Sequence, residues 1–211
     1  MGQELTFDDL VDDGTGVAIE AQRRLIELVG PNPAWQVRGR TLSLFGNYGR
    51  LDTTMHLLGT TSGADGTWLW SWDNPALTDT DVAQFVREFG TAHGIVEFAT
   101  ASDTWNGFEL SVAARAVTRL PFGYSYEFGS GSRAFTLLEH PELELPQPSV
   151  AAASAVLAEA LQGGVRDRRR VVQGYARARR IAHTWDDDFS AITLTLPDGA
   201  MTLEFAPVPT R

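Results

Sequence analysis

The sequence contains no cysteine and no lysine. Without cysteine the chain can form no disulfide, no thiolate nucleophile and no cysteine-ligated metal site. It also lacks an uninterrupted apolar run of about 18 residues, so no transmembrane helix is expected. The N-terminal residues are acidic and lack a basic segment followed by an apolar one, so we expect no signal peptide and, by default, a cytoplasmic location.

Motifs for metal, cofactor or phosphate binding are also scarce. Residues 129–132 (Gly-Ser-Gly-Ser) lack the following Lys-Ser/Thr and helix of a phosphate loop, so a hairpin turn is the better interpretation. The aspartates of residues 8–13 lack the spacing of a calcium loop, and a turn explains residues 186–188 (Asp-Asp-Asp) better than a magnesium site does. The four histidines show no helical pairing. The sequence therefore predicts no metal and no cofactor.

The 211 residues suit one domain, or one domain with a small appendage, and they carry a net charge of −10. That charge argues against general affinity for nucleic acid or anionic membranes. Its distribution is uneven, because residues 1–150 hold 20 acidic residues and 9 arginines, whereas residues 151–211 hold 7 and 8. The last quarter of the chain is thus the basic part.

Three of the six tryptophans lie at alternate positions in the stretch Gly66 to Pro75. Side chains alternate between the faces of a strand, so Trp68, Trp70 and Trp72 are expected on one face. The alternating run Leu51 to Thr60 precedes them, which predicts a β-hairpin with a longer loop and places Met55 and Leu57 beside the indoles.

The tryptophan face has two interpretations. Large aromatic side chains are usually core, and an exposed platform for a ligand or partner is the alternative. The opposite face would carry His56, Ser71 and Asp73, but no nucleophile elbow or oxyanion loop supports a catalytic triad there. The sequence therefore favours a non-enzymatic role.

Leu58-Gly59-Thr60, Gly66-Thr67-Trp68-Leu69-Trp70 and Asn74-Pro75 are followed by a predicted helix and by His93-Gly94-Ile95. This pattern resembles a family of bacterial proteins known only as a domain of unknown function. The likeness runs from about residue 20 to about residue 140 and could extend to the end. No catalytic or binding residues are established for that family, so the resemblance implies kinship and no activity.

The remaining patterns predict an α+β fold in which an antiparallel meander packs against helices. Residues 1–140 would form the main domain, and three prolines mark residues 141–148 as a linker. Residues 149–211 would form a small ααβββ module. Residues 1–16 are expected to be a frayed or capping segment, and the first helix is expected at Val17–Val29.

Seven of the seventeen arginines lie between Arg166 and Arg180. On a helix, five of them would lie broadly on one side and could bind phosphate or an acidic protein face. The alternative is internal pairing with the acidic N-terminal segment or with residues 186–188.

Three functions follow from these patterns. The first is a non-catalytic binding protein of immunity or antitoxin type with a protein partner. The second is a small-ligand binder or enzyme with a cleft near the tryptophan strand or between the two modules. The third is an arginine-mediated phosphate or nucleic-acid binder, although nucleic acid is disfavoured. The candidate site residues are Trp70, Trp72, His56 and Asp73, followed by Arg169, Arg170 and Arg177.

Overall fold

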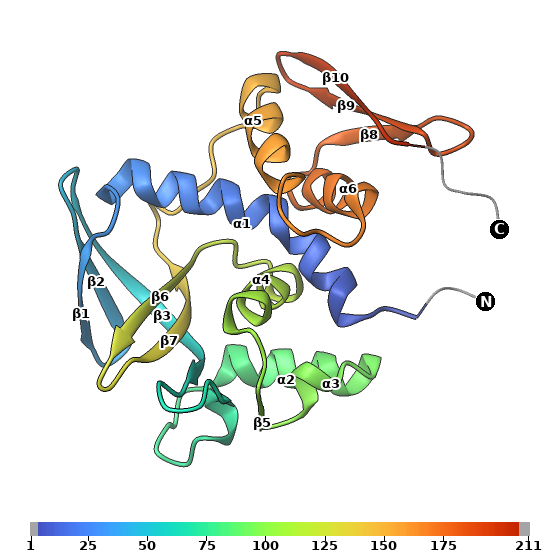
Figure 1. Cartoon of the computed structure of the whole chain (residues 1–211). Coiled ribbons are helices and arrows are strands. Elements are labelled where there is room, and N and C mark those ends of the chain that lie inside the picture. Colours follow the sequence, from blue (N-terminus) through green and yellow to red (C-terminus); the bar gives the residue numbers. More distant parts are fainter. Residues whose placement is uncertain (1–3, 207–211) are drawn as a thin grey trace.

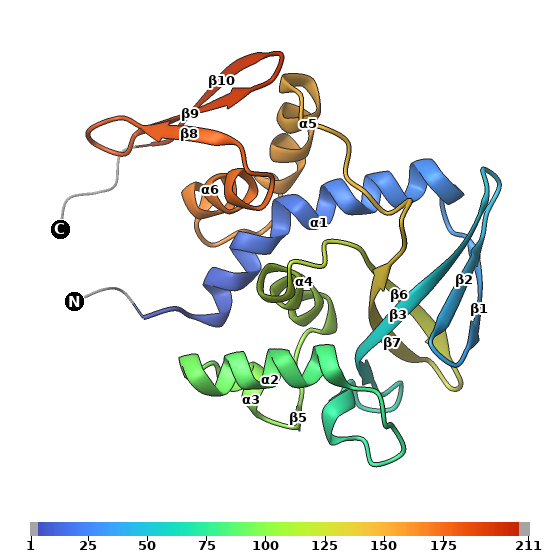
Figure 2. The same cartoon turned by 180° about the vertical axis from the view of Figure 1, so that it is seen from behind.

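Helix α1 (Phe7–Val29) runs through the middle of the molecule and contacts both of its halves (Figures 1 and 2). The computed structural model describes residues 4–206. Residues 1–3 of the predicted N-terminal segment and residues 207–211 of the predicted C-terminal module lie outside the described part. The other helices are α2 (Asp81–His93), α3 (Val96–Ala99), α4 (Gly107–Thr118), α5 (Val150–Ala160) and α6 (Arg168–Ala178).

The start of α1 corrects one prediction, because the helix begins ten residues before Val17. Thr6 is its N-cap: the Asp9 amide donates to the Thr6 hydroxyl at 3.2 Å, and the Thr6 amide donates to the Asp9 carboxylate at 2.9 Å. This reciprocal capping box satisfies amides that a helix start otherwise leaves unpaired. The apolar periodicity missed this part because the helix buries polar and small residues there, among them Asp12 and Gly14.

The larger sheet is antiparallel and curled, and it contains seven strands. Its path is β1-β2-β3-β4-β5, and β7 pairs with β3 and carries β6 at its other edge. Strand β3 is long enough to pair with β2 along its first part and with β7 along the rest, while its last three residues also pair with β4. The strands are β1 (Ala34–Arg38), β2 (Thr41–Phe45), β3 (Arg50–Thr61), β4 (Trp68–Trp70), β5 (Ser102–Asp103), β6 (Gly123–Phe128) and β7 (Ser132–Glu139). The predicted meander is confirmed, and the later hairpin extends it.

The tryptophan strand is shorter than expected. It ends at Trp70, and a single 3-10 turn (Ser71–Asp73) follows, so Trp72 leaves the line of the other two indoles. The predicted register was also wrong, because Trp70 pairs with Gly59 instead of lying beside Met55 and Leu57. A methyl group on Gly59 would lie 2.4 Å from the Trp68 ring, so the glycine makes room for that indole.

Helices α2, α3 and α4 cover the tryptophan end of the sheet. Trp68 and Trp70 have no exposed surface there and pack with Phe98 of α3 and Leu110 of α4. The C-terminal half of α1 covers the other end of the sheet in a second cluster that includes Leu25. Burial of large aromatic side chains is the main stabilising term in such clusters.

The last part of the chain forms the predicted ααβββ arrangement. Helices α5 and α6 pack on one face of a three-stranded antiparallel sheet, through Ile192, Leu194 and Leu196 on its central strand. Among the described residues, no helix is long and apolar enough to span a membrane. The strands of this second sheet are β8 (Ala182–Trp185), β9 (Ala191–Leu196) and β10 (Gly199–Glu204).

Two glycines let neighbouring helices approach α1 closely. A methyl group on Gly14 of α1 would lie 2.4 Å from the Val112 carbonyl oxygen of α4. A methyl group on Gly174 of α6 would lie 2.6 Å from the Asp13 Cα of α1. Real side-chain carbons do not approach so closely, so the packing of both modules on α1 requires glycine at these positions.

Candidate functional site

The first turns of α6 meet an acidic surface on α1. Arg166 Nε lies 2.9 Å from an Asp8 carboxylate oxygen, and the Arg170 guanidinium lies 3.1 Å from Asp9 and 2.6 Å from Asp13. Arg170 thus bridges two carboxylates, one through each terminal nitrogen, and such charge-assisted contacts are stronger than neutral hydrogen bonds. The internal pairing considered from the sequence is therefore present at this end of α6, with the acidic N-terminal segment as its partner.

Asp12 binds the backbone of the two residues that precede α6. Its carboxylate is 1% exposed and accepts the backbone amides of Arg166 and Asp167 at 3.2 and 2.7 Å. Burial raises the pKa of the Asp12 carboxyl above its ordinary value, and the two amides oppose that rise. Burial also raises the pKa of Asp13, against the opposing effect of Arg170.

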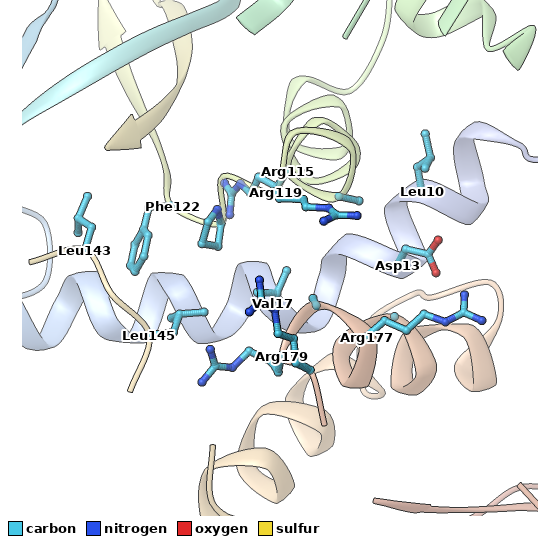
Figure 3. A pocket seen from close by; sticks show the side chains of 15 residues that line it. Leu10, Asp13, Val17, Arg115, Arg119, Phe122, Leu143, Leu145, Arg177 and Arg179 are labelled. Carbon is cyan, nitrogen blue, oxygen red and sulfur yellow. The ribbon is translucent and has the colours of Figure 1, made fainter. Parts of the chain in front are cut away.

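A cleft of about 640 Å³ lies between the two modules, with α1 as its floor (Figure 3). The last turn of α4 forms one wall and the C-terminal end of α6 forms the other, while the linker closes one end. We call this feature the arginine cleft. Its five arginines are Arg115, Arg119, Arg177, Arg179 and Arg180.

Arg115 lies inside the arginine cleft. Its Nη2 atom donates to the Ser111 hydroxyl at 3.3 Å, and its guanidinium lies over Gly123, where a methyl group would come within 2.4 Å of Nη2. It forms no ion pair with any described residue, and its Nε atom is buried without an acceptor. Burial lowers the pKa of Arg115 to about 10, because a desolvated charge is less stable than a hydrated one.

Three further guanidiniums of the arginine cleft form no ion pair within residues 4–206. Arg119 and Arg180 lie just beyond the ends of α4 and α6, and both adopt left-handed backbone angles, with φ of 60° and 54°. Arg177 lies in the last turn of α6 near Asp13, whose pKa its charge lowers. The arginine cleft therefore gathers positive charge that the described carboxylates do not neutralise.

Arg179 is the exception among the five. Its Nε atom lies 2.8 Å from a Glu20 carboxylate oxygen, and both side chains are largely buried. A second guanidinium nitrogen donates to the Pro146 carbonyl of the linker. Burial raises the pKa of Glu20 and, more strongly, that of the neighbouring Tyr175 hydroxyl. Arg179 thus links α1, α6 and the linker through these contacts. Its role is structural, because its charge is already paired with Glu20.

The end of the arginine cleft next to the linker is apolar. Phe122, Leu143 and Leu145 lie together there, away from Arg177 and Asp13 (Figure 3). Phe122 and Leu143 are buried, and Leu145 is half-buried. The linker therefore contributes an apolar wall to the cleft as well as a connection between modules.

The residues predicted near the tryptophan strand do not form one site. Trp70 is fully buried and donates its indole N–H to the Glu97 carbonyl at 3.0 Å. Trp72 is half-buried beneath the Arg87 guanidinium, which lies 4.3 Å from its ring. The His56 ring lies 2.5 Å from the Glu139 carboxylate on the neighbouring strand, and Asp73 is exposed.

The hypothetical triad is likewise not assembled. Ser71 is buried and donates to the Leu57 carbonyl at 2.6 Å, and no hydrogen bond within residues 4–206 joins Ser71, His56 and Asp73 to one another. The buried tryptophans of β4 confirm the core interpretation. Trp72, which the 3-10 turn carries away, is the only one of the three that retains exposed surface.

The predicted arginine residues have three different environments. Arg169 donates to the backbone carbonyls of Phe189 and Ala206 at 2.9 and 2.6 Å. Arg170 is ion-paired with α1, whereas Arg177 lines the arginine cleft. Sequence analysis missed Arg115 and Arg119, although their spacing of four residues on one helix was a signal that both would lie on the same face.

No group of three or more His, Asp or Glu side chains in the described part of the chain could hold a metal ion. What the fold and cleft define is an α+β protein that carries an arginine-lined cleft where α4, α1 and the C-terminal ααβββ arrangement meet. The chain belongs to a family of unknown function, DUF6882, whose model matches residues 8–141. That match ends where the linker begins, so α4 lies inside the matched region and α6 outside it. No curated protein and no solved structure matches the chain.

Proposed function

We propose that this protein is a non-catalytic binding protein that holds a small anionic ligand in the arginine cleft. The observation that carries the proposal is Arg115, a half-buried guanidinium in the arginine cleft whose Nε atom is buried without an acceptor and which has no carboxylate partner among the described residues. Placing such a charge in a protein interior is costly unless a counter-charge compensates it. A bound anion would supply that compensation, and Arg119, Arg177 and Arg180 would add to it.

Arginines at the ends of helices can also act by stabilising exposed carbonyl groups. Arg119 and Arg180 have positions that fit this role. Arg115 does not, because its hydrogen bond to Ser111 turns the guanidinium one turn back toward the start of α4. A structural role for the helix ends therefore leaves the most buried of the unpaired guanidiniums unexplained.

The lining of the arginine cleft favours binding over catalysis. Asp13 is its one carboxylate among the described residues, and that carboxylate lies 2.6 Å from Arg170. No histidine or hydroxyl side chain of the described residues lines the cleft. Acid–base and nucleophilic catalysis need such groups within hydrogen-bond reach of a substrate.

Thermal unfolding with a panel of anions tests the proposal. Inorganic phosphate, sulfate, citrate and sugar phosphates would be added to the protein, and a ligand at about 100 times its Kd should raise Tm by about 5 °C or more. The double variant Arg115→Gln, Arg119→Gln should lose that rise. Arg38→Gln on the edge strand β1 is the matched control, because Arg38 is exposed and unpaired in the described chain.

Two results would contradict the proposal. One is that no anion of the panel raises Tm. The other is that the double variant Arg115→Gln, Arg119→Gln keeps the rise in Tm just as the control Arg38→Gln does. The second result would place the anion elsewhere on the molecule.

A protein partner of immunity or antitoxin type is the second candidate function. Supporting it are Phe85, Val96 and Phe108, which are 50%, 63% and 58% exposed on α2, α3 and α4. Exposed aromatic side chains are common anchors in protein interfaces. If this function holds, Phe85→Ser with Phe108→Ser should abolish co-purification of the partner, and Arg115→Gln should leave it intact.

A further inference from the structure

The arginine cleft has two unlike ends. Phe122 and Leu143 form the apolar end together with Leu145, whereas Arg119 and Arg177 lie toward the other end (Figure 3). Two other arginines lie near the apolar end: the Arg115 guanidinium lies over Gly123, next to Phe122, and the charge of Arg179 is neutralised by Glu20. A ligand that fits both ends must therefore carry an anionic group at one side and an apolar group at the other.

The number of unpaired guanidiniums favours a phosphate over a carboxylate. Arg115, Arg119, Arg177 and Arg180 have no ion pair among the described residues, and Asp13 is already paired with Arg170. A carboxylate carries one charge on two oxygens, whereas a phosphate ester carries about −1.5 to −2 on three oxygens at neutral pH. The planar guanidinium fork matches phosphate oxygens well, and several forks can share one phosphate.

The size of the arginine cleft favours a ligand larger than inorganic phosphate. Its volume of about 640 Å³ lies within the usual range for small-molecule sites. A bare phosphate would leave the exposed part of Leu145 in contact with water, whereas Phe122 and Leu143 behind it are already largely covered by the protein. Covering that exposed part with hydrocarbon gains free energy in proportion to the apolar area removed from water.

We infer that the ligand is a soluble phosphate ester with an apolar substituent. Its phosphate lies among the four unpaired guanidiniums, and its apolar group lies against Leu145, Leu143 and Phe122. The inference rests on the proposed function and specifies the chemical class of ligand. Both modules then contribute to one site, since Arg115 and Arg119 lie on α4 whereas Arg177 and Arg180 lie at the end of α6.

Titration calorimetry with three probes tests the inference. The probes are hexyl phosphate, inorganic phosphate and hexanoate, which separate the contributions of the apolar group and the phosphate. We expect hexyl phosphate to bind about tenfold more tightly than inorganic phosphate, which corresponds to roughly two buried methylene groups. We also expect hexyl phosphate to bind at least about tenfold more tightly than hexanoate, because charge-assisted bonds to phosphate are stronger and more numerous.

The variant Leu145→Ser tests whether the linker contacts the apolar group of the ligand. The variant should lose the preference for hexyl phosphate over inorganic phosphate while its affinity for inorganic phosphate stays unchanged. Leu77→Ser is the control, because Leu77 is an exposed leucine outside the arginine cleft. The milder Leu145→Ala, with a melting curve for each variant, separates loss of the apolar contact from loss of folding.

Each contrary result has a distinct meaning. Equal affinity for hexyl phosphate and inorganic phosphate would remove the apolar end from the site, and equal affinity for hexanoate and hexyl phosphate would refute the phosphate class. Either result overturns the inference and leaves anion binding standing. If none of the three probes binds, the inference also fails, and the proposed function fails with it only if the wider anion panel leaves Tm unchanged.

A phosphate can also be presented by a lipid headgroup. The net charge of −10 opposes approach to an anionic bilayer, so we assign the ligand to the soluble phase. Sedimentation with phosphatidylcholine vesicles, with and without phosphatidic acid, checks this assignment. Sedimentation that depends on phosphatidic acid and is lost in Arg115→Gln would overturn it.

Discussion

The two ends of helix α6 carry the same kind of side chain in opposite circumstances. At its N-terminal end, Arg166 and Arg170 are ion-paired with Asp8, Asp9 and Asp13 of α1. At its C-terminal end, Arg177 has no carboxylate within ion-pair distance in the described chain and faces the arginine cleft. The comparison shows that an arginine-rich helix can serve folding at one end and leave charge available for a ligand at the other.

The cause of the difference lies on α1. Its acidic residues are concentrated in the first two turns, opposite the start of α6, and Glu20 further along is paired with Arg179. Between Asp13 and Glu20, the residue of α1 that lines the cleft is the apolar Val17. We expect substitutions at the N-terminal end to change stability and substitutions at the C-terminal end to change ligand binding.

The largest effect is expected for Gly174→Ala, which would push α6 away from α1. Its methyl group would meet the Asp13 backbone at 2.6 to 2.7 Å, and backbone atoms cannot yield as a flexible side chain can. We expect the free energy of unfolding to fall by about 3 kcal/mol. Urea denaturation measures it, with Gly164→Ala as the control because a methyl group there would meet no atom within 4 Å. Equal stability of the two variants would show that the helices are not tightly packed.

Arg170→Gln should have the next largest effect on stability. It leaves the partly buried carboxylates of Asp9 and Asp13 without their partner, so we expect a loss of about 2 kcal/mol in urea denaturation. Arg177→Gln at the other end of α6 should cost less than about 0.5 kcal/mol, because the side chain is exposed and unpaired in the described chain. Similar losses for both variants would contradict the comparison between the two ends.

We expect the free energy of unfolding to depend on pH through the buried carboxylates of α1. Burial raises the pKa of Asp13 and Glu20 above their ordinary values of 3.8 and 4.5, so the folded state binds these protons more tightly than the unfolded chain does. Their protonation therefore stabilises the fold, and this contribution is lost as the pH rises through the raised pKa values.

The double variant Asp13→Asn, Glu20→Gln isolates that contribution. The unfolding free energy of the parent protein, relative to the variant, should rise as the pH falls from about 7 to about 4.5. Denaturation at several pH values measures the difference. A relative fall over the same range would mean that the ion pairs with Arg170 and Arg179 outweigh burial.

A small effect on stability is also expected for Gly123→Ala, which acts on the ligand site. Its methyl group would displace the Arg115 guanidinium, the flexible end of a side chain that can move. We expect the affinity for inorganic phosphate to fall by about tenfold, as for one lost charge-assisted contact, with a stability loss below about 1 kcal/mol. Calorimetry checks the affinity, and Gly164→Ala again serves as the control. Unchanged affinity would show that Arg115 does not contact the ligand.

Local patterns in the sequence predicted much of the fold. The alternation from Leu51 to Thr60 indicated a strand, and the apolar stripe with Gly94 as terminator indicated helix α2, because each pattern repeats at the period of its own element. The ααβββ order of residues 149–211 was predicted from local patterns too, and the linker from its three prolines. The first turns of α1 were missed because that rule looks for a repeating stripe of apolar residues, and here the buried face includes Asp12, Gly14 and Gly16 beside Leu10 and Val11.

The candidate site could not be predicted in this way. Arg115 and Arg177 are far apart in the chain, and each belongs to a helix whose own pattern says nothing about the other. The tryptophan stretch was predicted as a candidate site because its pattern lies within ten consecutive residues. The structure buries two of its three indoles.

The sequence by itself determined the class of fold, most of its helices and strands, the absence of cysteine chemistry and the clustering of arginine near the C-terminus. Only the tertiary structure decided which arginines are neutralised and which remain available. The physical reason is that secondary structure follows from contacts between residues close in the chain, whereas the balance of charge around Arg115 depends on how α1, α4 and α6 pack. Packing across α1 also placed residues of the linker and both modules around a single cleft.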